Sequence, residues 1–199
     1  MIKEKIDLEN LADYCIKKAI TCGSTSCEVY VGSNVSETVN FRNRKIENSD
    51  QSDVLIINIT TYIGNKKSSS SLTYIDKNNT DKMIEKCVDV TKLLPEDKYN
   101  VLPDKNLLAT TSPDLLQFDN TEVNNQKKIE YLKHAEDAAL SNKFIIKTNG
   151  SSFTQLKNNF VFANSLGFSL GFKKSEFSSY TDLVAKKNDS GMERDYDYD

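Results

Sequence analysis

The segment VLIINITTY, residues 54–62, decides the fold of this 199-residue chain. It is the most β-prone stretch of the sequence, and its continuous apolar start is typical of a central strand. A turn at Gly64-Asn65 leads into residues 68–74, which we interpret as an antiparallel partner strand. The four serines at 68–71 also fit a flexible loop, and the sequence leaves this alternative open.

A helix and two strands are expected before this segment. Apolar residues recur at helical spacing over residues 8–22, where Asp7 can cap the start and Gly23 suits the left-handed position after the end. The face expected to be buried consists of Leu8, Leu11, Ala12, Cys15, Ile16 and Ala19. Two strands follow, at residues 27–31 and 37–41, joined by a loop at residues 32–34. A turn at residues 42–45 comes after the second strand.

A second helix and a long connection are expected after the partner strand. The helical pattern covers residues 81–94, with Thr80 as its cap and Pro95 as its stop. Residues 95–119 contain acids, prolines and short apolar pairs. They predict a surface connection with little regular structure, and such connections often wrap a domain or carry function.

The rest of the chain predicts one more helix and then strands only. The helix is expected over residues 122–142, with Asp119 or Thr121 as its cap. Its inward face is expected to consist of Ile129, Leu132, Ala135 and Ala139. The strands are expected at residues 144–147, 151–156, 160–163, 168–172, 177–186 and 192–199. The turns between them are expected at residues 149–150, 157–159, 164–167 and 188–191.

The predicted fold class is α+β, a mostly antiparallel β-sheet with about three helices packed against it. All seven glycines fall at predicted turns, helix ends or strand edges, which accounts for them without a phosphate-binding loop. The strand pattern continues to Asp199 without a closing turn. We therefore expect the chain to stop at a module boundary.

Composition excludes several classes of protein. A net charge of −3 with both signs interspersed lacks the basic footprint of a nucleic-acid-binding protein. The four cysteines form no C-x-x-C pair, so we interpret them as small buried residues in a reducing compartment rather than a zinc site. The N-terminus has no signal-peptide pattern and no apolar run approaches the ~20 residues of a membrane span. We expect a soluble cytoplasmic protein.

No catalytic constellation is visible in the sequence. The single histidine, His134, lies off the apolar face of the third helix, and we interpret it as an exposed residue rather than a general base. Ala135 and Ala138 follow it where the helix of a zinc protease needs a glutamate and a second histidine. We therefore expect no catalytic, cofactor-binding or metal-binding residue in this chain.

Two charged clusters allow alternative interpretations. The three acids at the end of the chain would share one strand face, where they suit either a hard cation or solvent; they are Asp195, Asp197 and Asp199. The three bases at the first predicted hairpin suit either a solvated turn or contact with phosphate or a partner's acids; they are Arg42, Arg44 and Lys45.

Seven short segments follow one another in a familiar order. They are CEVY at 27–30, FRNRKIE at 41–47, LPEDKY at 94–99, LPD at 102–104, NGSSF at 149–153, ANSLGF at 163–168 and GMERDYDY at 191–198. Together they resemble the TldD/PmbA family, also called the modulator-of-gyrase or TldD/TldE metalloprotease family, and the last three look like its PmbA (TldE) branch. Arg44 stands where the family pattern has glycine, the residue best suited to a tight turn.

The resemblance implies that the zinc-binding and catalytic residues lie outside residues 1–199. Full members of the family are roughly twice as long and have two domains. The TldD branch carries a zinc-binding helix beyond the region matched here, and the PmbA branch lacks it and pairs with TldD in a heterodimer that cleaves unfolded peptides. Residues 1–199 would then be the N-terminal domain of such a protein, with the C-terminal domain absent and zinc only in the TldD-type partner.

Our leading hypothesis is a non-catalytic N-terminal domain of a PmbA/TldE-like subunit, which scaffolds, dimerises and presents strand edges to an extended peptide. The expected partners are a TldD-type catalytic subunit or a second copy, and an unfolded peptide substrate, with no membrane. The alternatives are a peptidase in its own right, a stand-alone protein-interaction module, the remnant of a truncated gene, and a gyrase-associated or nucleic-acid-associated module. The acidic balance opposes the last of these.

Overall fold

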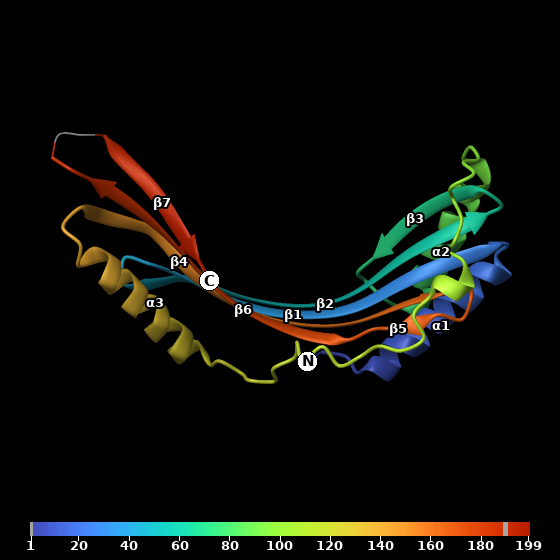
Figure 1. Cartoon of the computed structure of the whole chain (residues 1–199), viewed down its shortest axis with the longest axis horizontal. Coiled ribbons are helices and arrows are strands. Elements are labelled where there is room, and N and C mark those ends of the chain that lie inside the picture. The colour runs from blue at the N-terminus through green and yellow to red at the C-terminus, as the bar shows by residue number, and fades with distance from the viewer. Residues whose placement is uncertain (1, 189–190) are drawn as a thin grey trace. The chain divides into compact units, whose positions relative to one another are not determined.

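A computed structural model describes residues 2–188 and 191–199 and confirms the α+β class. Within those residues the chain forms three α-helices, one 3-10 turn and seven strands (Figure 1). The helices are α1 (Lys5–Thr21), α2 (Lys77–Leu93) and α3 (Asn125–Leu140), and the 3-10 turn is Lys105–Leu107. The strands are β1 (Ser26–Arg42), β2 (Lys45–Ile63), β3 (Lys66–Leu72), β4 (Ile145–Asn164), β5 (Ser169–Leu170), β6 (Lys173–Lys186) and β7 (Met192–Tyr198). The sheet order is β3-β2-β1-β4-β6-β7, with β5 beside β4.

The chain divides into two compact units that are interleaved in sequence. Unit 1 consists of Met1–Asn34, Asp53–Gln117 and Asn158–Lys174, and unit 2 consists of Val35–Ser52, Phe118–Lys157 and Ser175–Asp199. The strands β1, β2, β4 and β6 each contribute residues to both units. In Figure 1, α1 and α2 cover the strands of unit 1, and α3 covers the strands of unit 2. The single N-terminal domain expected from the resemblance stays a prediction.

The core of unit 1 forms where the apolar faces of α1 and α2 pack against residues 54–62 of β2. Strand β2 lies between β1 and β3, as predicted for an interior strand, and Ile57 and Ile59 are fully buried. The helices contribute Leu8, Ala12, Cys15, Ala19, Ile84, Cys87 and Val88 to this core. Burying a large aliphatic side chain stabilises the fold by about 1.5–3 kcal/mol, so these two helix faces contribute much of the stability of unit 1.

The predicted partner strand is confirmed and the alternative of a serine loop is wrong. β3 pairs antiparallel with β2, with Leu72 opposite Ile57 and Lys66 opposite Ile63. Two of the four serines, Ser68 and Ser69, have hydroxyl partners within the fold, which favours an ordered strand over a loop. Ser68 Oγ, for example, donates to the carbonyl oxygen of Cys87 at 2.8 Å.

Three predicted breaks lie inside strands and are wrong. The loop expected at residues 32–34 is part of β1, and the turns expected at 149–150 and 157–159 are part of β4. The turns were predicted from glycine and asparagine, but Asn159 is buried and its Nδ2 donates to the carbonyl oxygen of Lys3 at 2.8 Å. Gly150 takes its positive φ of 141° within the strand. The partners of these residues are remote in sequence, so local composition could not reveal them.

The predicted start of α1 is also wrong. The helix begins at Lys5, so Asp7 lies inside the first turn, and the capping residue Glu4 makes no side-chain capping bond. Asp7 still favours the helix because an acid near a helix N-terminus interacts with the macrodipole. Gly23, at a φ of 103°, ends the helix as expected.

The caps of α2 and α3 lie elsewhere than predicted. Asp76 caps α2 by accepting from the backbone N–H of Asn79 at 2.8 Å, and Thr80 is buried within the helix. Asn124 caps α3 instead of Asp119 or Thr121. The observed cap is an Asx residue in both helices, before the predicted cap in α2 and after the predicted caps in α3, and Asx side chains are strong caps. The connection between the helices has little regular structure, as expected.

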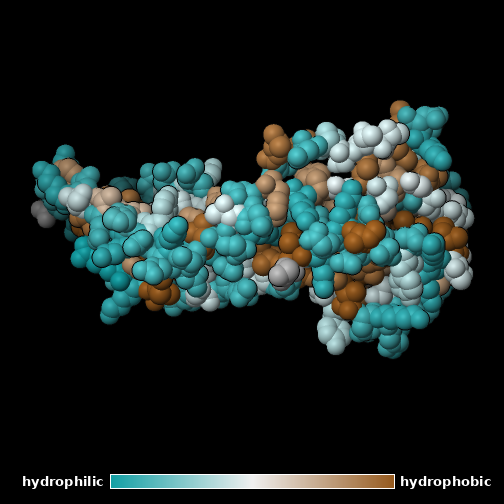
Figure 2. Space-filling model, turned by 90° about the horizontal axis from the view of Figure 1, so that it is seen from below, coloured by the Kyte–Doolittle hydropathy of each residue, from teal (hydrophilic) through white to brown (hydrophobic). Residues whose placement is uncertain are grey.

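The remaining elements follow the predictions closely. β7 forms over Met192–Tyr198 and pairs antiparallel with β6, and β5 is shorter than expected. The turn expected at residues 188–191 includes positions 189 and 190, which lie outside the described residues. None of the helices in the described ranges is long and apolar enough to cross a membrane. Figure 2 shows a largely hydrophilic surface on which apolar side chains gather in separate patches.

Candidate functional site

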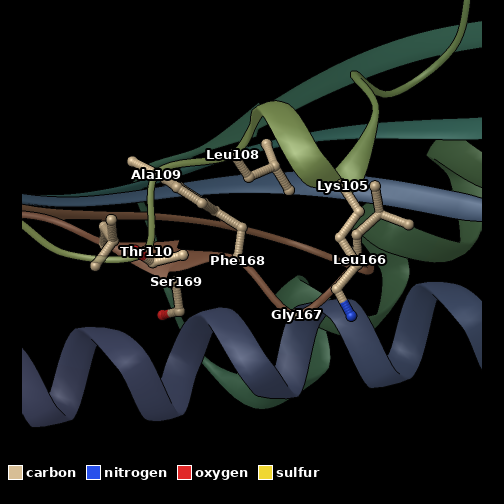
Figure 3. A pocket seen from close by; sticks show the side chains of 9 residues that line it. Lys105, Leu108, Ala109, Thr110, Leu166, Gly167, Phe168 and Ser169 are labelled. Atoms are coloured by element: carbon tan, nitrogen blue, oxygen red, sulfur yellow. The ribbon is translucent and has the colours of Figure 1, made fainter.

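A pocket of about 270 Å³ lies in unit 1 (Figure 3). It is formed by residues 105–110 of the connection after α2 and by residues 166–170 around β5. Leu108, Leu166 and Phe168 give it an apolar lining, and Lys105 is its one charged residue. No imidazole or carboxylate lines it, so the pocket suits a bound apolar side chain better than acid–base chemistry.

A second hollow of unit 1, of about 380 Å³, lies between β3 and one ridge of α2. We call it the β3–α2 groove. It is lined by Ser70, Ser71, Leu72, Asn79, Lys82, Met83 and Lys86. Residues 79, 82, 83 and 86 share one side of α2 because they are three or four positions apart. The groove is therefore bounded by a strand on one side and by lysines on the other.

A polar cleft of about 290 Å³ in unit 2 surrounds Asp182. The carboxylate is 2 % exposed and accepts from Arg194 Nε at 2.8 and 3.0 Å, from Asn149 Nδ2 at 3.1 Å and from the Tyr180 hydroxyl at 3.2 Å. Hydrogen bonds from Arg194 hold the pKa of Asp182 below its ordinary value, with Asn149 and Tyr180 acting in the same direction and burial acting against them. A carboxylate in this state is a weak base.

The ion pair between Asp182 and Arg194 should make the stability of the protein depend on pH. Asp182 has a folded pKa below its unfolded value, so the ion pair stabilises the protein above about pH 4 and that stabilisation is lost as pH falls through the folded pKa. Arg194→Gln should raise the pKa of Asp182 and destabilise the protein more at pH 7 than at pH 2.5. Urea denaturation at both pH values and an NMR titration of the carboxyl carbon measure this. Glu193→Gln is the control, and an equal loss at both pH values would contradict the assignment.

α3 buries two charged residues against the strands of unit 2, and both were missed by the sequence analysis. Lys128 is fully buried, and its Nζ donates to Glu37 Oε2 at 2.7 Å. Glu136 is fully buried and accepts from the backbone N–H groups of Asn43 and Arg44 at 3.0 and 2.6 Å and from the Thr148 hydroxyl. Both charges are used inside the fold, so they tie α3 to the strands and are not free for a substrate.

The inward face of α3 therefore differs in part from the prediction. Leu132 is fully buried and Ile129 packs against the same apolar cluster, as expected, whereas Ala135 and Ala139 are only partly buried. The four-residue spacing of Lys128, Leu132 and Glu136 was the available signal. Counting only apolar residues toward the buried face concealed it.

The charged residues that the sequence singled out do not come together. His134 is exposed on α3, as predicted. At the hairpin, Arg42 pairs with Glu47 and Arg44 Nε lies 2.8 Å from Asp137 Oδ1, so two of the three bases contact acids of their own chain. The three terminal acids are exposed. Among residues 2–188 and 191–199, no three His, Cys, Asp or Glu side chains are grouped to hold a metal ion.

The four cysteines are free thiols. Burial raises the pKa of the Cys15 thiol and of the Cys27 thiol to about 12. Both thiols are therefore protonated at neutral pH, and a protonated buried thiol is a poor nucleophile and a poor metal ligand.

Two family models match the chain in the order expected from the resemblance. The one described as PmbA/TldA metallopeptidase domain 1 matches residues 27–90, and the one described as PmbA/TldA metallopeptidase central domain matches residues 118–199. Together they cover most of the chain. Their boundaries differ from those of the compact units, because each model is continuous in sequence and each unit is not.

Two curated relatives agree with these matches. The metalloprotease PmbA of Escherichia coli O157:H7 is 32 % identical over 88 % of this chain, and the metalloprotease PmbA homologue of Buchnera aphidicola is 30 % identical over 98 %. The chain covers only 39 % and 44 % of these two proteins.

The solved structures show the same fold. A protein described as a modulator of DNA gyrase, from Bacteroides thetaiotaomicron, superimposes with a TM-score of 0.89 at 22 % identity, over all of this chain and 45 % of the other. TldE from Thermococcus kodakarensis superimposes with a TM-score of 0.73 at 16 % identity, over 96 % of this chain and 42 % of the other. On the two family models and the curated relatives, the chain belongs to the PmbA/TldD family.

Proposed function

We propose that this chain is a non-catalytic part of a PmbA/TldE-like subunit and that it binds a TldD-type metalloprotease subunit, which supplies the zinc. The observation that carries the proposal is the state of the buried carboxylates. Both oxygens of Glu136 accept hydrogen bonds from the chain itself, and Asp182 is held ionised by Arg194. Glu136 is fully buried and bound by three donors of the chain itself, so it cannot reach a substrate, and the lowered pKa of Asp182 makes that carboxylate a weak base.

The family relationship supports the choice of partner. The curated relatives are named metalloproteases, and one structural neighbour is a TldE. In the proposed complex this chain is a folded platform in the cytoplasm, the partner carries the reacting groups, and an unfolded peptide is the substrate. A homodimer is the alternative assembly.

Co-expression with a TldD-type subunit from the same organism tests the proposal. We expect the two chains to co-purify and to form a complex at micromolar concentration, measured by size-exclusion chromatography with light scattering. Casein cleavage should require the TldD-type chain and should stop when a chelator removes its metal. Chelator-sensitive cleavage by this chain alone would overturn the non-catalytic role. A folded chain that forms only homodimers would overturn the choice of partner.

A further inference from the structure

The outer edge of β3 is open for pairing with another strand. β3 is at the end of the sheet order, and its seven residues pair with β2 on one side only within the described residues. On the open side, alternate backbone N–H and C=O groups point outward, as in any antiparallel edge strand. The side chains in the middle of β3 are serines, which are too short to block an approaching backbone.

The side of the groove formed by α2 carries positive charge that the fold does not use. Lys82 and Lys86 are exposed, and within the described residues no carboxylate pairs with either of them. The acids of α2 all have partners of their own. Asp81 accepts from the Tyr14 hydroxyl, Glu85 pairs with Lys18 at 2.6 Å and Asp89 pairs with Lys92 at 2.7 Å.

The floor of the groove is apolar. Leu72 of β3 and Met83 of α2 line it, and both are partly buried. Methionine is flexible and adapts to different apolar side chains. An edge strand, an apolar floor and a helix that faces the edge form the arrangement in which domains bind an extended peptide as an added strand.

From these features we infer that the β3–α2 groove binds an extended peptide segment with an acidic residue at every second position. The backbone of the segment pairs with the open edge of β3. Every second side chain of a bound strand faces α2 and the others face away from it, so acids at alternate positions reach Lys82 and Lys86 while their aliphatic stems lie on Leu72 and Met83. A second copy of this chain does not suit the groove, because symmetric pairing of two β3 edges would bring four unpaired lysines together.

This inference deepens the proposed platform function, since it names an edge and a class of peptide, but its test uses no TldD-type subunit. Failure of the peptide to bind would therefore leave complex formation with the metalloprotease subunit untouched. Failure of that complex would likewise leave peptide binding to be decided by its own titration.

The test is a fluorescence-anisotropy titration of the whole chain with a labelled decapeptide of five Glu-Val repeats. We expect saturable binding that weakens with added salt. A decapeptide of five Lys-Val repeats should bind at least about tenfold more weakly because its charges meet Lys82 and Lys86. Hydrogen exchange should show protection of residues 66–72 when the Glu-Val peptide is bound. Equal binding of the two peptides, or protection elsewhere and not at β3, would overturn the inference.

A charge reversal separates the groove from general charge effects. The double variant Lys82→Glu/Lys86→Glu should lose at least about tenfold in affinity. The control Lys127→Glu/Lys133→Glu makes the same change in net charge at two exposed positions of α3, and it should bind within about twofold of the parent. Circular dichroism checks that each variant is folded, and Lys82→Gln/Lys86→Gln replaces the reversal if it is not. Parent-like binding by a folded groove variant would overturn the inference.

Discussion

Glu136→Ala is expected to destabilise the protein by about 3 kcal/mol, because it removes a buried acceptor that serves three donors. The substitution leaves the backbone N–H groups of Asn43 and Arg44 and the hydroxyl of Thr148 without their partner. Asn43 and Arg44 have φ values of 53° and 59°, a left-handed backbone conformation that is unfavourable for a residue such as arginine. The bonds to Glu136 therefore stabilise a strained turn, and the turn should loosen when they are lost.

Urea denaturation followed by far-UV circular dichroism measures this loss. Glu136→Gln keeps one carbonyl acceptor but turns an amide N–H₂ toward a backbone N–H, so its loss should be intermediate. Glu130→Gln, on the exposed side of the same helix, is the matched control and should change the free energy of unfolding by less than about 0.5 kcal/mol. If Glu136→Ala were as stable as the control, the proposed role of this carboxylate in the hairpin would be wrong.

Gly171→Ala is expected to have a comparable effect in unit 1, for a steric reason. A Cβ at this position would lie 1.8 Å from the carbonyl oxygen of Phe160 and 2.8 Å from the Cα of Val161. Both atoms belong to the backbone of β4, which cannot move aside without breaking its pairing. Overpacking of this kind typically costs 1–3 kcal/mol and sometimes more, so we expect a loss of about 3 kcal/mol.

The melting temperature should fall by roughly 10 °C in Gly171→Ala, since each kcal/mol corresponds to about 2–4 °C in a domain of 150–250 residues. Gly191→Ala is the matched control, because a Cβ there meets no atom within 4 Å. A melting temperature for Gly171→Ala within about 2 °C of that of the control would show that the two backbones do not approach each other as closely as described.

Periodicity predicted the elements whose partners are nearby or apolar. Four of the six expected inward residues of α1 are buried, and Leu11 and Ile16 pack against the same core while partly exposed. The hairpin of β2 and β3 follows from a turn between two strand-like segments. These signals are local, because a few neighbouring residues are enough to predict a helix face or a tight turn.

The predictions were wrong where a polar residue meets a distant partner. Asn159 bonds to Lys3, 156 positions away, and so continues a strand that its composition appeared to end. Lys128 and Glu136 face the strands of unit 2 because Glu37 and the β1–β2 hairpin satisfy them. No local rule contains such information, since it is the sheet that brings the partners together.

The candidate site was less accessible to sequence reasoning than the fold. The sequence shows that the lysines of α2 are surface charges. Nothing in the local sequence shows that Lys82 and Lys86 flank an open strand edge while the three acids of α2 have other partners. Their significance depends on which side of the helix faces β3, which is a property of packing.

The interleaving of the two units has a consequence for how such proteins can evolve. The family's first and central domains are continuous in sequence and separated by the connection after α2, which makes that connection look like a natural point for exchange between relatives. Yet β1 of the first half and β4 of the second are neighbours in the sheet. A chimaera would have to match side chains along the whole boundary between these two strands. Recombination between distant homologues should therefore be selected against, even though the connection where the crossover would occur has little regular structure.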